Sequence, residues 1–177
     1  MAQMLVNNDS DFWGPSTPSQ LNALVAQNPS LVPYGPQGWI DPCPRMLTLN
    51  TTVAPWDNKA MRHALSYAMD RQQIVNVVYE GVGAPSNFIF PTYKAMQPYI
   101  DAGQDTLAPI GEFNLDKAHQ LIESQGYKMD SGSGKYVGTD GKTLSIDLVA
   151  PPFMEPWGRM VVQQLNADGI DAALRTL

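Results

Sequence analysis

Four tryptophans stand out as candidate binding residues. Each lies beside glycine or proline or at a predicted helix start, and none lies in the middle of a predicted helix. A tryptophan in a loop offers a large flat ring with one N–H donor, suited to stacking on a sugar or covering a peptide side chain. The alternative is that each ring fills the seam between a loop and the core. We predict that Trp13, Trp39 and Trp157 line a ligand-binding cleft.

The residues that could act as nucleophiles or metal ligands are sparse. Cys43 is the only cysteine, and His63 and His119 are far from it in sequence, so a cysteine–histidine pair is not indicated. The polar run at residues 7–11 could in principle bind calcium, but it lacks the glycine and the bidentate glutamate of a calcium loop. The chain has no zinc-type spacing and no glycine-rich phosphate-binding motif. We therefore expect no metal and no cofactor.

Hydrolytic chemistry is no better supported. No G-x-S-x-G motif occurs. The carboxylate pairs Asp9/Asp11 and Asp101/Asp105 are expected in polar loops, where both members stay ionised, whereas an acid–base pair needs one desolvated carboxyl group. We expect that the protein is not an enzyme. A glycoside-processing enzyme remains an alternative function. It would require a desolvated carboxylate pair.

Composition narrows the possible partners. The chain has 177 residues, enough for one compact domain, with 11 Lys and Arg against 17 Asp and Glu, a net charge of −6. No basic cluster exists to bind nucleic acid, and an acidic surface is not attracted to anionic lipid. No apolar run is long enough to span a membrane. The first residues are expected to form a strand and a loop, so any targeting segment would lie outside this chain.

Capping signals and apolar spacing predict the elements of the first half. A helix begins after Thr17 and ends at Asn28, and residues 31–32 and 46–49 are short strand candidates. A second helix opens at Asp57, and a further helix follows a bend near Asp70. Their apolar stripes are Met61, Ala64, Leu65, Ala68 and Met69, and then Ile74, Val77 and Val78.

The second half predicts a strand–helix–strand unit. Asn114 caps a short helix, and residues 128–142 form a Gly/Ser-rich segment with a hairpin turn at Asp140-Gly141. Residues 143–150 alternate as a strand, a helix opens at Pro156, and residues 170–176 alternate again. The two strands of such a crossover should be parallel. Because the chain stops at that final strand, we expect it to have been cut from a longer protein.

A strand–helix junction precedes the clearest helix. Arg62 lies five residues after Asp57, and we predict an internal ion pair between them. Asn50, Asp57 and Arg62 are therefore assigned to holding this junction.

Residues 50–71, from Asn50-Thr51 through Pro55-Trp56-Asp57 to Asp70-Arg71, resemble the signature of the family 5 extracellular solute-binding proteins. These are the oligopeptide-, dipeptide- and nickel-binding components of ABC importers. In that family a Pro-aromatic-Asp turn precedes a helix of the form R-x-A-[LI]-x-Y-A-[IM]-D-R, and a Gly-x-Gly-x-Pro follows, here at residues 81–85. The segments 114–127, 140–142 and 163–171 resemble the family as well, so the resemblance covers about residues 46–177 and, less closely, the first 45.

The resemblance implies an α/β fold: a single lobe, residues 1–177, of a two-lobed class II periplasmic-binding-protein-like structure, with a mixed sheet and flanking helices. It implies capture of an oligopeptide or oligosaccharide between two lobes that close on the ligand. The implied partners are the missing first lobe of the same protein and the membrane subunits of an ABC transporter. The implied location is periplasmic or extracellular, membrane-associated through the parent protein. A protein-interaction module, which would expose a large apolar patch, remains a second alternative.

Overall fold

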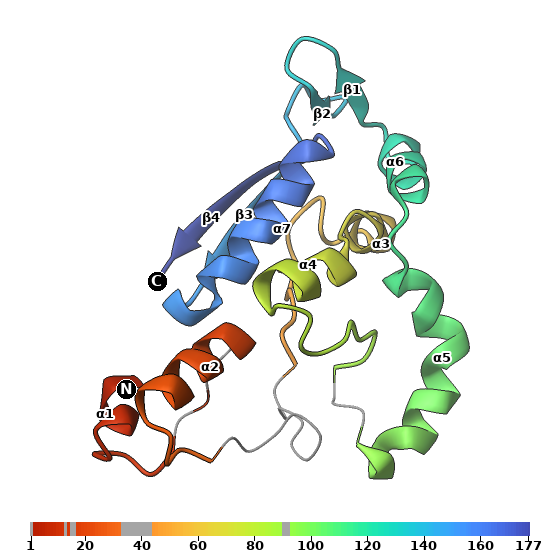
Figure 1. The fold of residues 1–177 in the computed structure, drawn as a ribbon. Helices are drawn as coiled ribbons and strands as arrows, with labels where there is room; N and C mark the ends of the chain where they lie inside the picture. The colour runs from red at the N-terminus through yellow and green to blue at the C-terminus, as the bar shows by residue number, and fades with distance from the viewer. Residues whose placement is uncertain (1, 13, 15–16, 33–43, 90–92) are drawn as a thin grey trace.

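The computed structural model describes residues 2–12, 14, 17–32, 44–89 and 93–177, which form an α/β structure (Figure 1). The helices are α1 (Ala2–Val6), α2 (Pro18–Gln27), α3 (Lys59–Tyr67), α4 (Arg71–Val78), α5 (Gln97–Gly111), α6 (Leu115–Ser124) and α7 (Glu155–Ala167), with 3-10 turns η1 (Lys94–Met96) and η2 (Pro152–Met154). The strands are β1 (Lys128–Asp130), β2 (Lys135–Val137), β3 (Ser145–Ala150) and β4 (Asp171–Thr176). None of the helices in these ranges is long and apolar enough to cross a membrane.

The N-terminal segment forms a pair of helices. The prediction of a strand at the start of the chain is wrong, because residues 2–6 form α1. Asn28, just after α2, donates its side-chain amide to the carbonyl of Val6 at 3.0 Å and to Oδ1 of Asn8 at 3.1 Å. Thr17 caps α2 as predicted, accepting from the N–H of Gln20. A contact with a helix twenty residues away thus fixes the start of the chain, and local sequence does not reveal it.

The predicted bend between α3 and α4 is confirmed, with Asp70 as the N-cap of α4. All five residues of the first apolar stripe are buried. Two details differ from the sequence reading. Asn58, not Asp57, caps α3 by accepting from the N–H of Ala60, and on α4 it is Val75 that is buried, while Val77 is exposed. A helix of two turns is too short for its apolar spacing to show which of two neighbouring positions is buried.

Helix α5 was not predicted. It carries both Asp101 and Asp105, so the expectation that these residues lie in a polar loop is wrong. Pro98 suits its first turn, whereas Gly103 and Pro109 obscure the helical pattern. The helix is held partly by packing, since a Cβ atom at Gly103 would lie 3.0 Å from the ring of Phe88.

The C-terminal half contains two separate two-stranded sheets. β1 and β2 are antiparallel; β2 coincides with the residues predicted to precede the hairpin turn, whereas β1 was not predicted. The turn at residues 138–141 leads from β2 towards β3, as the Asp140-Gly141 motif predicts. β3 and β4 are parallel, with Ser145 opposite Asp171 and Ala150 opposite Thr176, which confirms the predicted crossover. The described strands thus include both pairing types, but in two sheets.

The strand candidates at 31–32 and 46–49 form no strand. A strand needs a neighbour that accepts and donates along its backbone, and no described strand pairs with either segment. Leu47 and Leu49 nevertheless pack against the core, so the alternation at 46–49 correctly marked an apolar face.

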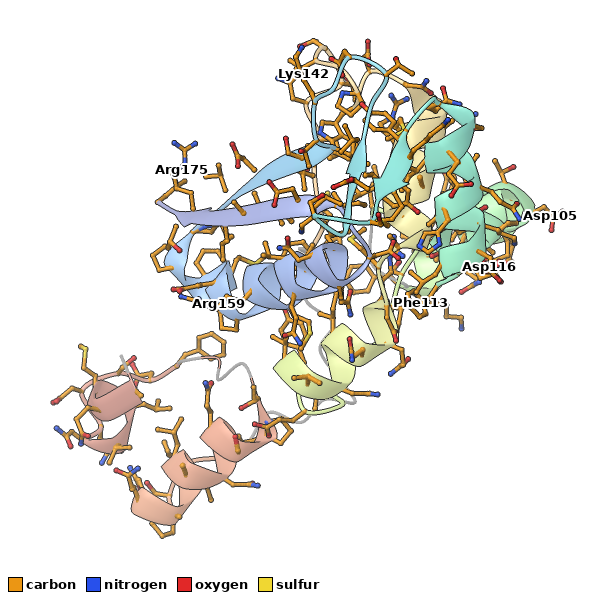
Figure 2. The ribbon with its side chains drawn as sticks, turned by 90° about the horizontal axis from the view of Figure 1, so that it is seen from above. Asp105, Phe113, Asp116, Lys142, Arg159 and Arg175 are labelled. Carbon is orange, nitrogen blue, oxygen red and sulfur yellow. The ribbon has the colours of Figure 1, made fainter. Side chains whose placement is uncertain are left out.

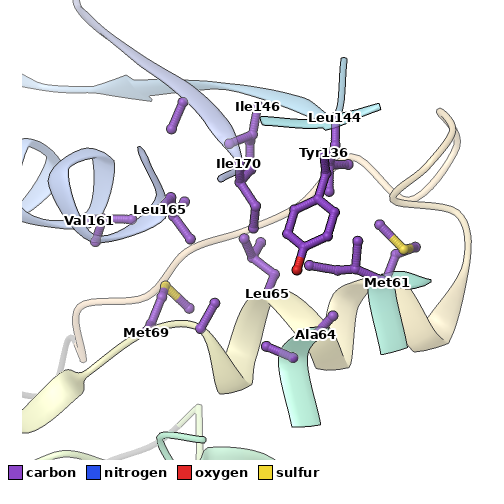
Figure 3. Packing of buried hydrophobic residues seen from close by; sticks show 14 of the residues in the cluster. Met61, Ala64, Leu65, Met69, Tyr136, Leu144, Ile146, Val161, Leu165 and Ile170 are labelled. Atoms are coloured by element: carbon purple, nitrogen blue, oxygen red, sulfur yellow. The ribbon is translucent and has the colours of Figure 1, made fainter. Parts of the chain in front are cut away.

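The core lies where α3, α6, α7 and the β3–β4 pair meet. Tyr136 projects from β2 between Leu65 and Met61 of α3, with Ile170 and Leu165 on its other side (Figure 3). β3 alternates exposed and buried residues along its whole length, so one face of the sheet is buried. Gly169 ends α7 with φ of +83°, a conformation that a residue with a Cβ adopts only at a cost.

Candidate ligand-binding site

The carboxyl ends of β3 and β4 lie at the same edge of the structure. The strands are parallel and in register, and the N–H of Leu177 donates to the carbonyl of Ala150 at 3.1 Å, so the pairing continues to the end of the strands. In open α/β sheets, ligands bind in the crevice outside the carboxyl ends of the strands. This edge is therefore the candidate binding site.

The loop that leaves β3 presents an aromatic ring at this edge. Pro151 and Pro152 fix the backbone, the N–H of Met154 donates to the carbonyl of Pro151 at 2.9 Å, and the chain then enters α7. Phe153, at the centre of this turn, is 75% exposed. The ring is therefore accessible to a ligand or to a covering surface at the carboxyl ends of the strands.

Helix α7 is held close to the sheet below this loop. Gly158 is buried, and a Cβ atom there would lie 2.8 Å from Cδ1 of Leu174 on β4. The N-cap residue Met154 offers no side-chain hydrogen bond to the first turn. The partial positive charge at the start of α7 is therefore left uncapped by that side chain, beside the exposed ring of Phe153.

Of the charged side chains near this edge, Arg159 is already paired with a carboxylate on its own helix. Arg159 donates Nε to Oε1 of Glu155 at 2.9 Å, and Nη2 contacts the same oxygen. Arg159 and Arg175 lie on opposite sides of the layer formed by β3, β4 and α7 (Figure 2). The loop from Pro151 to Met154 carries no ionisable side chain, so its surface is apolar.

Only a shallow hollow lies on this part of the sheet. It measures about 220 Å³ and is lined by Asp147, Leu148, Ala173, Leu174 and Arg175. A larger hollow, about 450 Å³, lies on the β1–β2 hairpin. Small-molecule sites usually enclose most of the ligand surface in 300–1,000 Å³. The hollow on β3 and β4 is smaller than that, so an enclosed ligand site there would need a second covering surface.

The three tryptophans predicted to bind ligand are placed differently. Trp157 lies in the first turn of α7, next to the candidate loop, and is partly buried against the core. Trp13 and Trp39 lie outside the described residues, as does Cys43. Phe153 was missed by the sequence reading. The sequence does carry a signal for Phe153, since an aromatic residue between prolines follows a predicted strand.

The residues of the predicted strand–helix junction hold backbone groups. Arg62 donates Nη1 to the carbonyls of Trp56 at 2.9 Å and Asp57 at 2.8 Å. No ion pair between Arg62 and the Asp57 carboxylate is among those of the described residues, so the predicted ion pair is wrong. Asn50 accepts from the N–H of Thr52 at 3.1 Å, closing a local turn. A guanidinium can satisfy two carbonyls at a turn without any carboxylate.

Arg71, which the sequence reading left without a role, is the most extensively bonded cation in the described structure. Its guanidinium donates to the carbonyls of Ser66 at 2.9 Å, Met69 at 3.3 Å and Gly111 at 3.4 Å, and to Oγ of Ser66 at 2.7 Å. Burial lowers the pKa of Arg71. The carbonyl-rich ends of α3 and α5 converge on this one charge, which the helix dipoles favour.

A family model described as bacterial extracellular solute-binding proteins, family 5 Middle, matches residues 1–177. The chain belongs to this family. Arg62 and Arg71 stand at the two arginine positions of the helix signature, and both bind backbone carbonyls at the ends of α3.

The dipeptide-binding protein of Escherichia coli K12 is 30% identical over 137 residues, which cover 73% of this chain and 22% of that protein. The oligopeptide-binding protein AppA of Bacillus subtilis, solved with a nonapeptide, aligns with a TM-score of 0.60 and 27% identity, over 72% of this chain and 25% of that one. This chain spans about a fifth to a quarter of the length of these relatives.

A periplasmic oligopeptide-binding protein of an ABC transporter from Thermotoga maritima, solved with mannohexaose, aligns over 98% of this chain and 33% of that one. Its TM-score is 0.71 at 19% identity, which shows a shared fold and nothing more. The similarity extends over nearly the whole chain, so the helix pair α1–α2 belongs to the same fold as the rest.

Proposed function

We propose that this chain is part of one lobe of the substrate-binding component of an ABC importer, which captures an oligopeptide or an oligosaccharide between two lobes. The observation that carries the proposal is the exposed ring of Phe153, held on a proline-fixed loop at the carboxyl ends of two parallel strands. A facing lobe would cover this ring and enclose the ligand. The relatives of the same family, a dipeptide-binding protein and an oligopeptide-binding protein, support this ligand class.

The same proposal includes no catalytic step. Asp168 is the one buried carboxylate among the described residues, and its hydrogen-bond partner is His119, not a second carboxylate. That arrangement gives no support to a glycosidase-type pair. We further infer that the parent protein is periplasmic or extracellular, is associated with the membrane, and delivers its ligand to the transporter's membrane subunits.

The test uses the full-length parent protein. Thermal unfolding is measured with a panel of di- to nonapeptides and a panel of manno- and gluco-oligosaccharides. A ligand present at a hundred times its dissociation constant adds about 2.7 kcal/mol to the free energy of unfolding, which raises the melting temperature measurably. We expect one of the two panels to raise it. A parent protein whose melting temperature responds to neither panel would overturn the importer function.

The role of the site is tested separately with Phe153→Ala. Loss of a stacked ring should weaken ligand affinity by roughly tenfold, the equivalent of about 1.4 kcal/mol. Phe113→Ala is the matched control, because Phe113 is also exposed but lies before α6, away from the strand ends (Figure 2). Equal affinities of both variants and the wild type would remove Phe153 from the site.

A further inference from the structure

The carboxylate of Asp168 is placed where a negative charge is costly. Asp168 is the C-cap of α7, and its side chain is only 5% exposed. Oδ1 lies 2.5 Å from Nε2 of His119 on α6, whereas Oδ2 is buried with no hydrogen-bond partner. A buried carboxylate at the negative end of a helix dipole is disfavoured unless it is paired. Stabilisation of this negative charge therefore depends on a single residue among those described, His119.

The other titratable groups around the pair do not neutralise it. The ring of Tyr136, on β2, lies 5.9 Å from the ring of His119. Burial and the negative charges of Asp168 and of Glu123, on α6, disfavour ionisation of the Tyr136 phenol. Lys135, the neighbouring cation on β2, directs its ammonium group to Oδ1 of Asn166 at 2.5 Å and to the carbonyl of Ile170. Neutralisation of the Asp168 carboxylate therefore depends on the proton that it shares with His119.

The pair also has access to protons. The side chain of His119 is 37% exposed, so solvent reaches the imidazole although the carboxylate is buried. The contact spans 49 residues of sequence and joins α6 to the turn between α7 and β4. A change in its protonation therefore acts on the contact between these two elements.

We propose that His119 and Asp168 form a pH-sensitive latch between α6 and the α7–β4 turn, closed while the pair shares a proton and weakened when the proton leaves. While the proton is held, the carboxylate is neutralised in place. After the proton is lost, an anion remains buried against a neutral ring, with Oδ2 still unbonded.

The sign of the pH effect follows from the burial. Desolvation raises the pKa of Asp168, while the contact with His119 partly opposes this. A group whose pKa is higher in the folded than in the unfolded state contributes stability below its unfolded pKa, and this contribution is lost as pH rises through the folded pKa. The latch therefore stabilises the fold below the ordinary pKa of an aspartate and loses that stabilisation as pH rises above it, the reverse of an ordinary salt-bridged aspartate.

The test compares the full-length parent protein with its Asp168→Asn variant in urea unfolding between pH 3 and pH 8. Asparagine keeps the shape of aspartate but cannot take up the proton. We expect the folded-to-unfolded ratio of the wild type to fall relative to the variant as pH rises, by at most about tenfold per pH unit for one proton. Asp105→Asn is the control, since Asp105 lies exposed on α5 and should leave the profile unchanged. A wild-type-to-variant ratio that stays constant across this range overturns the latch.

Hydrogen exchange of the wild type gives a second readout that needs no substitution. After correction for the intrinsic rate, amides of α6 and of residues 168–171 should lose protection between pH 5 and pH 8, while those of α3 keep theirs. Equal changes in α3 and α6 would show a global effect and would also overturn the proposal.

Discussion

Gln164 on α7 pairs with both backbone groups of Asp70, 94 residues earlier in the chain. Oε1 accepts from the N–H of Asp70 at 3.2 Å, and Nε2 donates to its carbonyl at 3.1 Å. The same Nε2 also donates to Oε1 of Gln73 at 2.6 Å. One amide side chain thus binds the N–H of Asp70 at the bend between α3 and α4, and it adds a second donor to the Asp70 carbonyl, which also accepts from the N–H of Ile74 at 3.2 Å.

Replacing Gln164 by alanine should destabilise the fold by about 1–3 kcal/mol, because the partly buried N–H of Asp70 loses its partner and the carbonyl of Asp70 loses one of its two donors. Chemical unfolding of the two proteins measures this difference. Gln163→Ala is the matched control, since Gln163 is the exposed neighbour on the same helix and should change stability by less than about 0.5 kcal/mol. Similar losses in both variants would mean that the contact with Asp70 makes no specific contribution to stability.

Replacing Arg71 by lysine should cost about 2 kcal/mol, although the charge is kept. A guanidinium reaches the carbonyls of Ser66, Met69 and Gly111 together, whereas an ammonium group cannot match that fork. The free energy of unfolding measures the loss. Arg175→Lys, on the exposed face of β4, serves as the reference and should be near neutral. A tolerated Arg71→Lys would show that charge alone suffices at this junction.

Tyr136 should make the fold sensitive to alkali. Burial, together with the charges of Asp168 and Glu123, raises the pKa of Tyr136 from 10.0 to about 12. Stability from the neutral phenol is complete below pH 10 and is lost as pH rises towards 12, a difference of about 2–3 kcal/mol for two pKa units. Tyr136→Phe should remove this decline in an unfolding series from pH 9 to pH 12.

The exposed Tyr99 provides the comparison for that series, because Tyr99→Phe removes a phenol that is already in solvent. Its profile should follow the wild type. If Tyr136→Phe declined as steeply as the wild type between pH 10 and pH 12, the alkaline transition would belong to other groups.

Much of the local structure was readable from the sequence. Thr17, Asp70 and Asn114 cap helices as predicted, because a cap needs only a side chain and a backbone N–H two or three residues away. Helix α5 escaped prediction, because its glycine and proline residues contradict a helical pattern that packing against Phe88 sustains. The partners of Arg62 were not predicted either. The sequence gives the charge and position of Arg62, but not the backbone carbonyls that it binds.

The sequence by itself determined the parallel strand–helix–strand unit, the buried stripe of α3 and the family, all of which follow from the order and spacing of residues along the chain. Only the tertiary structure decided that Gln164 meets Asp70, that Asp168 is buried against His119, and that Phe153 stands exposed at the strand ends. Each of these depends on how elements far apart in the chain pack against one another. The spacing of apolar residues along one element does not indicate which distant elements it contacts.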